Sequence, residues 1–312
     1  MAKRGFSRLS GARLQVLLAA ALLAAALAAP VTAGEAAEAA PPGRVVSLVP
    51  AITETLFALG LGPRVVGVSS YCDYPPEARS LPKVGTFSEP VAEAIVTLHP
   101  DLVLTSPSPG NETSVRAVER SGIRVAVVQS EGGLGESRAA MLAVADAVGE
   151  HEAGLRLVGA IDARIAAVGA RAAALAHPVA AVVVGREPLV LAGPASYLGE
   201  LLVLAGGRNV ADPVGGRWPQ VGIEFLVAAA PQVLVDLSIA MGDSPRAGID
   251  APSSWASLSS LPAVASGRVV TDRASLMLRP GPRLGDAAEA LFEALHPQSP
   301  AGTGAQAPKA AQ

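Results

Sequence analysis

The chain has 312 residues, of which 50% are hydrophobic and 16% charged, and its net charge at pH 7 is −3. Four basic and no acidic residues lie before residue 34, so taking these four charges from −3 leaves −7 for the remainder, which disfavours nucleic acid and anionic membranes as partners. A single cysteine, Cys72, excludes an internal disulfide. The length suits two lobes of about 100–150 residues, each able to bury a core.

Residues 1–33 have the pattern of a cleaved secretory signal peptide. Basic residues are followed by a Leu/Ala-rich run and by small residues typical of a signal peptidase site ending at Ala33. We therefore expect an exported protein. Residues 34–43, rich in Ala, Glu and Pro, are predicted to form a flexible lead.

Residues 44–149 are predicted to form an N-terminal α/β lobe. Valine-rich or otherwise apolar runs at 44–48, 65–68 and 102–105 alternate with helical patterns that end at glycine or proline. This alternation is typical of βαβ units, and apolar runs indicate parallel strands that are buried on both faces of a sheet.

Residues 150–177 are predicted to form one long helix between two lobes. The sequence from Glu136 to Ala176 contains almost no helix breakers, and its apolar residues recur at helical spacing. A helix in place of a Gly/Ser linker would be a stiff connection that limits hinge opening.

Residues 178–297 are predicted to form a C-terminal α/β lobe. Its strands are expected at 180–184, 189–191, 233–237 and 268–271, and its helices at 197–204 and 284–295. The tail, residues 298–312, is rich in Ala, Gly, Pro and Gln and is predicted to be disordered.

A loop–helix–strand unit occurs twice, 131 residues apart. The first copy begins at Phe87 with Glu93 six residues later, and the second begins at Trp218 with Glu224 at the same spacing. Each copy continues to a proline and a short apolar strand. The repeat predicts two lobes built alike, which present equivalent loops to one another across a cleft.

Three aromatic residues are candidates for ligand contact. Tyr71, Phe87 and Trp218 are expected in loops beside proline and serine, where core packing would not place them. Ligands of open α/β sheets bind at the ends of the strands, and aromatic faces there suit a flat, partly apolar ligand. The alternative is that these residues only pack their own loops.

Glu93 and Glu224 lie in the first turns of their predicted helices, and two interpretations are open. A carboxylate there stabilises the positive end of the helix by about 0.3–1 kcal/mol. Two carboxylates at equivalent places on two lobes could also meet two arginines of a twofold partner. The two interpretations do not exclude each other.

No motif predicts a catalytic or metal site. The run Gly132–Gly135 lacks the third glycine of a dinucleotide fingerprint, because Arg138 stands there, and it is predicted to be a loop. Cys72 has no nearby histidine, and no serine lies on a nucleophile elbow. Three histidines that each precede a proline are expected to cap helix ends: His99, His177 and His296.

Several stretches, taken in order, resemble the helical-backbone class of periplasmic substrate-binding proteins, which serve ABC importers of vitamin B12, haem and ferric siderophores. The likeness extends over about residues 44–297, and its motifs lie at Arg44–Glu54, Val68–Pro76, Pro100–Val103, Trp218–Val221 and Leu261–Val269. The stretches Ser-Ser-Tyr-Cys-Asp-Tyr-Pro-Pro (69–76) and Trp-Pro-Gln-Val (218–221) are most similar to members that bind corrinoids.

The resemblance implies an α/β fold with two similar lobes, parallel sheets, one long bridging helix and a ligand cleft between the lobes. It also implies a periplasmic protein that is not an enzyme and has no cofactor or metal site of its own. Such a protein would capture a corrinoid, similar to cobalamin, and deliver it to the permease dimer of an ABC importer. We expect it to be a monomer.

The resemblance also assigns residues. Tyr71 and Trp218 match corrin contacts, and Phe87 stands where corrinoid-binding members have tryptophan. Val190 lies near a position that is phenylalanine in those members, and Ser106 replaces a pocket tryptophan. Glu93 and Glu224 match the two glutamates that members present to permease arginines.

Other ligands stay open. Haem would use an axial tyrosine such as Tyr71, and a ferric siderophore would favour cleft arginines, for which Arg186 and Arg217 are candidates. An alternative of another class is an exported metal-dependent enzyme of nitrogenase-like fold, against which one cysteine and the scattered histidines argue.

Overall fold

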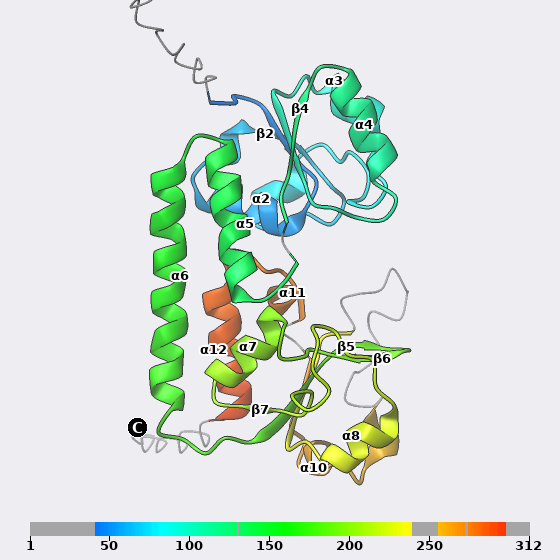
Figure 1. The fold of residues 1–312 in the computed structure, drawn as a ribbon, viewed down its shortest axis with the longest axis vertical. Helices are drawn as coiled ribbons and strands as arrows, with labels where there is room; N and C mark the ends of the chain where they lie inside the picture. Colours follow the sequence, from blue (N-terminus) through cyan, green and yellow to red (C-terminus); the bar gives the residue numbers. More distant parts are fainter. Residues whose placement is uncertain (1–40, 130, 239–254, 272–273, 298–312) are drawn as a thin grey trace, which may run out of the picture. The chain divides into compact units, whose positions relative to one another are not determined.

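The computed structural model describes residues 41–129, 131–238, 255–271 and 274–297 (Figure 1). The predicted signal peptide, the lead up to residue 40 and the predicted disordered tail lie outside these residues. Among the helices within the described ranges, none combines the length and hydrophobicity that crossing a bilayer requires.

The first sheet has four parallel strands in the order β2-β1-β3-β4. Its strands are β1 (Val45–Ser47), β2 (Val65–Val68), β3 (Leu102–Thr105) and β4 (Arg124–Val127). Val45 and Leu102 pack into the core on one face, whereas Val46 and Val103 pack into the core on the other. Burial on both faces explains why β1 and β3 are almost entirely apolar, as predicted.

Helices cover both faces of this sheet. They are α2 (Pro50–Ala58), α3 (Ala92–Thr97), α4 (Glu112–Arg120) and α5 (Leu134–Ala147), with 3₁₀ turns η1 (Gly62–Arg64) and η2 (Pro76–Ser80). Leu56 of α2 and Val144 of α5 share one core, and Ile95 of α3 and Val118 of α4 share the other. Helix α2 begins at Pro50, whose fixed φ and missing N–H suit the first helical position.

The predicted long helix is present as α6 (His151–Ala172). Its buried residues Val158, Ile161, Ile165 and Val168 recur every three or four positions and join the core of the second sheet. The helix ends at Ala172, five residues before the predicted end at 177. Pro178 disfavours helical geometry only in His177, so it does not account for the earlier end. The domain boundaries that the sequence predicts around this helix stay a prediction.

The second sheet has the order β6-β5-β8-β9, with β7 also paired to β5. Its strands are β5 (Val179–Arg186), β6 (Leu189–Leu191), β7 (Arg208–Asn209), β8 (Val233–Asp236) and β9 (Val269–Val270). All pairs are parallel except β5 with β6. Only two residues, Glu187 and Pro188, separate these strands, and so short a connection can join only antiparallel neighbours.

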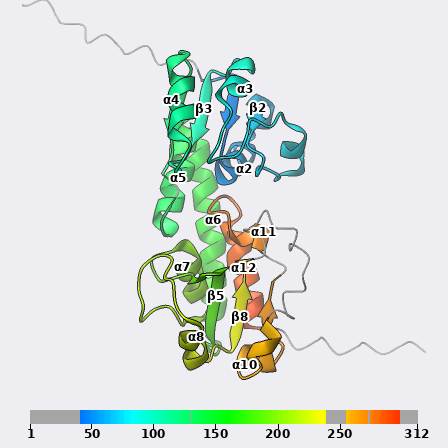
Figure 2. The same cartoon turned by 90° about the vertical axis from the view of Figure 1, so that its right-hand side faces the viewer.

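Helices also flank this second sheet. They are α7 (Tyr197–Leu204), α8 (Ile223–Ala229), α10 (Pro262–Ala265), α11 (Ala274–Met277) and α12 (Leu284–Leu295), with a 3₁₀ turn η4 (Ala256–Leu258). Val182 packs into the core shared with α6, α7 and α12, and Val183 into the core shared with α8. Figure 2 shows α12 beside α6, where Arg171 binds Glu289 at 2.7 Å.

The repeat found in the sequence is confirmed in the fold. One copy forms α3 and β3, and the other forms α8 and β8. Both helices are followed by a left-handed residue before a proline, His99 with φ 45° and Ala230 with φ 46°. The carbonyls of Leu98 and His99, which directly follow α3, accept hydrogen bonds from the side chain of Arg44 at 2.7–3.2 Å, so Arg44 makes the capping contacts that were expected of His99.

Candidate ligand-binding cleft

Two adjoining cavities lie between the two sheets. The first, about 500 Å³, is formed by the start of α2, the 70–73 loop, Phe87 and the 275–280 segment. The second, about 520 Å³, is formed by Glu131, the β5–β6 hairpin, Tyr197 and Trp218. Leu278 and Pro280 line both cavities, so the two form one cleft with a common floor.

The three predicted aromatic residues all lie in this cleft. Tyr71 and Phe87 line the first cavity and Trp218 lines the second. Each is 39–40% exposed, which is unlike a core residue. The rings of Tyr71 and Phe87 are 5.7 Å apart between centroids, and Trp218 meets Tyr197 edge-on at 6.2 Å. Each wall of the cleft therefore carries an aromatic pair.

The chain holds the two repeated loops in place through backbone and amide hydrogen bonds. On the first wall, the buried Asn111 side chain donates to the carbonyl of Phe87 at 3.3 Å. On the second wall, the Trp218 loop pairs with the end of β6, since the N–H of Leu191 donates to the carbonyl oxygen of Pro219 at 3.0 Å. Gly193 is required beside this loop because a Cβ there would lie 2.3 Å from the Gly216 oxygen.

The two other predicted contacts have different surroundings. Val190, half-buried in β6, lines the second cavity. Ser106 is 9% exposed, and its hydroxyl donates to the carbonyl of Val128 at 2.6 Å. It is not among the described residues that line either cavity, and the Asn111 amide binds its carbonyl at 2.9 Å. Its assignment as a ligand contact stays a prediction.

Glu93 and Glu224 lie away from the cavities, on the first turns of α3 and α8. Both are exposed, and neither forms an ion pair with another residue that the structure describes. Their carboxylates are therefore accessible at equivalent positions in the two halves of the fold.

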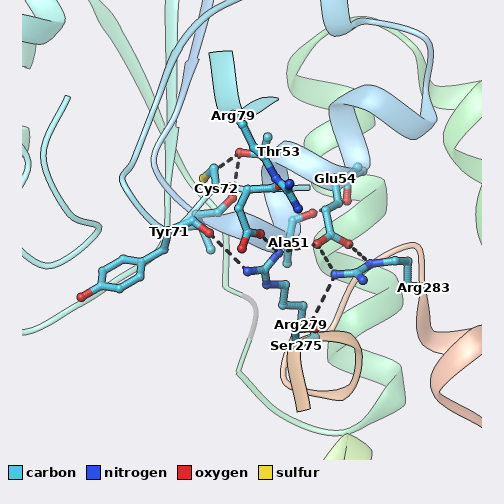
Figure 3. Close-up of polar contacts among 12 residues, drawn as sticks. Ala51, Thr53, Glu54, Tyr71, Cys72, Arg79, Ser275, Arg279 and Arg283 are labelled. Atoms are coloured by element: carbon cyan, nitrogen blue, oxygen red, sulfur yellow. Dashed lines mark hydrogen bonds and ion pairs between the residues drawn. The ribbon is translucent and has the colours of Figure 1, made fainter. Parts of the chain in front are cut away.

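A charged cluster beside the first cavity escaped the sequence analysis (Figure 3). Glu54 of α2 has a side chain only 1% exposed, and it accepts hydrogen bonds from Arg279 at 3.2 Å and from Arg283 at 2.6 and 2.8 Å. Arg279 also binds Asp73 at 2.5 Å, and the guanidinium of Arg283 lies 4.1 Å from the ring centroid of Tyr74. The cluster joins the first lobe to the loop before α12.

Tyr197 was also missed as a lining residue. It begins α7, is 4% exposed, and its hydroxyl donates to the carbonyl of Met277 at 2.8 Å. Burial raises the pKa of this phenol well above its usual range. The residue lines the second cavity, and its hydroxyl binds the segment that leads to Leu278.

The arginines proposed for a siderophore are both engaged. Arg186 binds the buried carboxylate of Asp236 with its Nε at 2.9 Å, and it stacks over Trp255 at 4.5 Å. Arg217 is paired with Glu131 at 3.4 Å. The charged residues that the structure describes along the two cavities are Asp73, Glu131, Glu187 and Arg279, three acidic and one basic.

The glycine-rich loop before α5 is not arranged for phosphate. The N–H of Gly133 donates to Glu136 at 2.9 Å, and the N–H of Leu134 donates to Glu200 at 3.3 Å. Carboxylates therefore occupy the positive end of the helix where a phosphate would bind. This agrees with the prediction of an ordinary loop.

The described part of the chain holds no group of three side chains that could ligate a metal ion. Cys72 is fully buried, and its sulfur lies 3.1 Å from the hydroxyl of Thr53 and 3.2 Å from that of Ser69. Burial raises the pKa of the thiol despite these hydrogen bonds. Such a thiol is a packing residue and not a nucleophile.

Comparisons with known proteins place these features in a family. A family model described as "Periplasmic binding protein" matches residues 45–276. The vitamin B12-binding protein of Salmonella choleraesuis is 33% identical over 192 residues, which are 62% of this chain and 71% of the relative.

Two solved structures are similar over nearly their whole length. The periplasmic heme-binding protein BhuT in complex with two hemes has a TM-score of 0.68 and 30% identity, covering 81% of this chain and 97% of its own. The periplasmic vitamin B12 binding protein BtuF of Vibrio cholerae has a TM-score of 0.65 and 27% identity, covering 82% of this chain and 97% of its own.

Proposed function

The chain belongs to the periplasmic binding protein family, and on this premise we propose that it captures a corrinoid outside the cytoplasm and delivers it to the permease dimer of an ABC importer. In this role the protein binds and releases its ligand unchanged. The observation that carries the proposal is the cleft, whose two walls expose Tyr71 and Phe87 on one side and Trp218 on the other.

The dimensions of the cleft favour a large, flat ligand. Small-molecule pockets usually enclose about 300–1,000 Å³, and the two cavities of about 500 and 520 Å³ share a floor. Aromatic side chains on opposite walls can contact both faces or edges of a macrocycle, whereas a small polar ligand would leave them in water.

The charge of the cleft favours a corrinoid over haem. Relatives that bind vitamin B12 and haem are similarly close to this chain, so their names do not choose between the ligands. Haem carries two propionates, yet the one basic lining residue described, Arg279, already binds Asp73 and Glu54. A corrinoid carries mostly neutral amide side chains, which can donate to carboxylates such as Glu131 and Glu187.

Haem is the second candidate because Tyr71 offers a phenol at the cleft, 40% exposed. Haem held by an axial bond from this phenol would bring its Soret band to the purified protein, and Tyr71→Phe would shift or weaken that band. A ferric siderophore fits less well, since Arg186 and Arg217 already bind Asp236 and Glu131.

The chain has only two tryptophans, which makes fluorescence a selective test. Trp218 lines the cleft, while Trp255 is 4% exposed and donates its N–H to Asp236 at 2.8 Å. We expect cyanocobalamin or cobinamide to quench the emission saturably at one equivalent, after correction with free tryptophan. No quenching beyond that correction would reject the corrinoid.

Variants of the two tryptophans then assign the contact. Trp218→Ala should raise the Kd about tenfold, since an aromatic contact contributes about 0.5–1.5 kcal/mol beyond its buried area. Trp255→Phe is the matched control and should leave the Kd unchanged. Equal Kd values for wild type and Trp218→Ala would remove Trp218 from the ligand site.

The same proposal assigns Glu93 and Glu224 to permease docking. Their equivalent, exposed positions on α3 and α8 support it, because a permease dimer offers each of them the same surface. Reversing both to arginine should abolish uptake and leave ligand affinity intact. Glu152→Arg, at an exposed first-turn position of α6, is the control that should keep uptake. Lost affinity in the double variant would contradict the docking role.

A further inference from the structure

Arg279 connects the loop before α12 to the loop that carries Tyr71. Its guanidinium donates to the carboxylate of Asp73 at 2.5 Å and to the backbone carbonyl of Tyr71 at 3.3 Å. The two acceptors flank Cys72, and Arg279 itself is 206 residues distant from Asp73 in sequence. The side chain is 15% exposed, so water screens these contacts only in part.

Cationic side chains bind the backbone carbonyls of three consecutive residues in the Tyr71 loop. Arg279 binds the carbonyl of Tyr71, Lys83 binds that of Cys72 at 2.9 Å, and Arg79 binds that of Asp73 at 2.8 Å. Lys83 and Arg79 are local in sequence, so they can fix the loop only to its own lobe. Arg279 is the contact that relates this loop to the floor of the cleft.

The position of Arg279 is itself fixed. Glu54 accepts from Arg279 at 3.2 Å and holds Arg283 by two further hydrogen bonds. Leu278 and Pro280, the residues on either side of Arg279, line both cavities. The arginine therefore holds the cleft floor and the Tyr71 loop at one relative position. Figure 3 shows the ring of Tyr71 pointing away from this cluster.

We propose that Arg279 is a positioning residue for ligand binding, which acts through Asp73 and the Tyr71 carbonyl to set the place of the Tyr71 ring against the cleft floor. This inference rests on the proposed function only in that Tyr71 is taken as a ligand contact. A preorganised ring loses little conformational freedom on binding, so the loss of Arg279 should act mainly on how long the ligand stays bound.

The first test uses no ligand. Hydrogen–deuterium exchange of the purified protein reports the amides of Ser70 and Cys72, which bind the carbonyls of Gly85 at 2.8 Å and Ser69 at 3.1 Å. In Arg279→Met we expect exchange in this segment to rise about tenfold, the effect of one charge-assisted hydrogen bond. Arg164→Met, which removes an exposed ion pair between Arg164 of α6 and Asp286 of α12, is the control. Unchanged exchange in Arg279→Met would overturn the proposal.

The second test measures corrinoid dissociation. Arg279→Met should speed dissociation about tenfold, and Asp73→Asn by less, because the asparagine oxygen can still accept from Arg279 but carries no charge. The double variant should add little to Arg279→Met, which already removes this contact. Arg279→Lys keeps the charge but lacks the fork that reaches two acceptors, so it should be intermediate. Additive effects would overturn the positioning role. If wild type binds no corrinoid, the proposed ligand is wrong, while the exchange result still decides the role of Arg279.

Discussion

The buried carboxylate of Glu54 should be among the most sensitive positions for stability. Its side chain is 1% exposed and accepts three hydrogen bonds from the guanidinium groups of Arg279 and Arg283. Glu54→Gln keeps the size of the side chain, removes its negative charge and turns one acceptor into a donor. Two guanidinium groups would then share one neutral oxygen in a site that water barely reaches.

The expected cost follows from this geometry. Breaking a buried ion pair by removing one partner costs about 3–5 kcal/mol of stability. Glutamine keeps one acceptor oxygen, so we expect Glu54→Gln to lower the free energy of unfolding by about 3 kcal/mol. For a protein of this size each kcal/mol lowers the Tm by about 2–4 °C. We therefore expect a fall in Tm of about 6–12 °C.

Thermal unfolding followed by circular dichroism measures this change. Glu112→Gln is the matched control, because Glu112 on α4 is paired with Arg116 at 3.8 Å while 77% exposed. Exposed pairs contribute little, so the Tm of this control should stay close to wild type. Equal Tm values for Glu54→Gln and Glu112→Gln would refute the reasoning.

Three further predictions follow from single contacts. Partial burial raises the pKa of Asp73, but its arginine partner outweighs burial and holds the pKa below the ordinary value of 3.8. The loss of stability in Asp73→Asn should therefore have its full size above pH 3.8 and become smaller as the pH falls further. Gly133→Ala should cost about 1 kcal/mol in urea unfolding, since its Cβ would lie 1.9 Å from the Glu200 carboxylate, whereas Gly135→Ala, with open space, should gain about 0.5 kcal/mol. Because burial raises the pKa of Cys72, thiol reagents should label it only on unfolding.

Each of these has a clear contrary result. An Asp73→Asn deficit that grows with acid would mean that the carboxylate is not stabilised in its ionised form. Equal effects at Gly133 and Gly135 would remove the contact with Glu200 as the cause. Rapid labelling of Cys72 in native buffer would mean that the Tyr71 loop opens without global unfolding.

The elements of this fold could be predicted from sequence wherever one local pattern dominates. Strands β1 and β3 were evident because both of their faces are buried and their residues are almost all apolar. Helix α6 was evident because its apolar positions recur without interruption over many turns. Strand β6 was predicted at residues 189–191, but its antiparallel pairing with β5 was not, although only two residues separate the two strands.

The aromatic part of the cleft was predictable for a different reason. Phe87 and Trp218 occupy equivalent positions of a repeat, so their loops had to lie at equivalent places in two similar sheets. Tyr197 was not predicted to line the cleft because it begins an apolar helix, and such a position is typical of a core residue. Its hydroxyl is indeed buried, where it donates to the carbonyl of Met277.

The charged cluster could not be found from spacing. Glu54 meets Arg279 and Arg283 across 225 and 229 residues, and no local pattern connects such distant positions. One signal was available: Glu54 is the only charged residue of α2, whose remaining residues are mostly apolar. A carboxylate in such a helix must find a partner or remain exposed, and the search for that partner leads to the arginines before α12.

Competition between the two flat ligands tests the central claim most directly. The purified protein is mixed with equimolar cobinamide and hemin, separated from free ligand by gel filtration, and examined by absorption spectroscopy. Our account predicts one equivalent of corrin absorption and no Soret band, because the described cleft is aromatic on both walls and acidic in balance. Our account would be contradicted if hemin displaced the corrin, so that the protein carried a Soret band which Tyr71→Phe weakens.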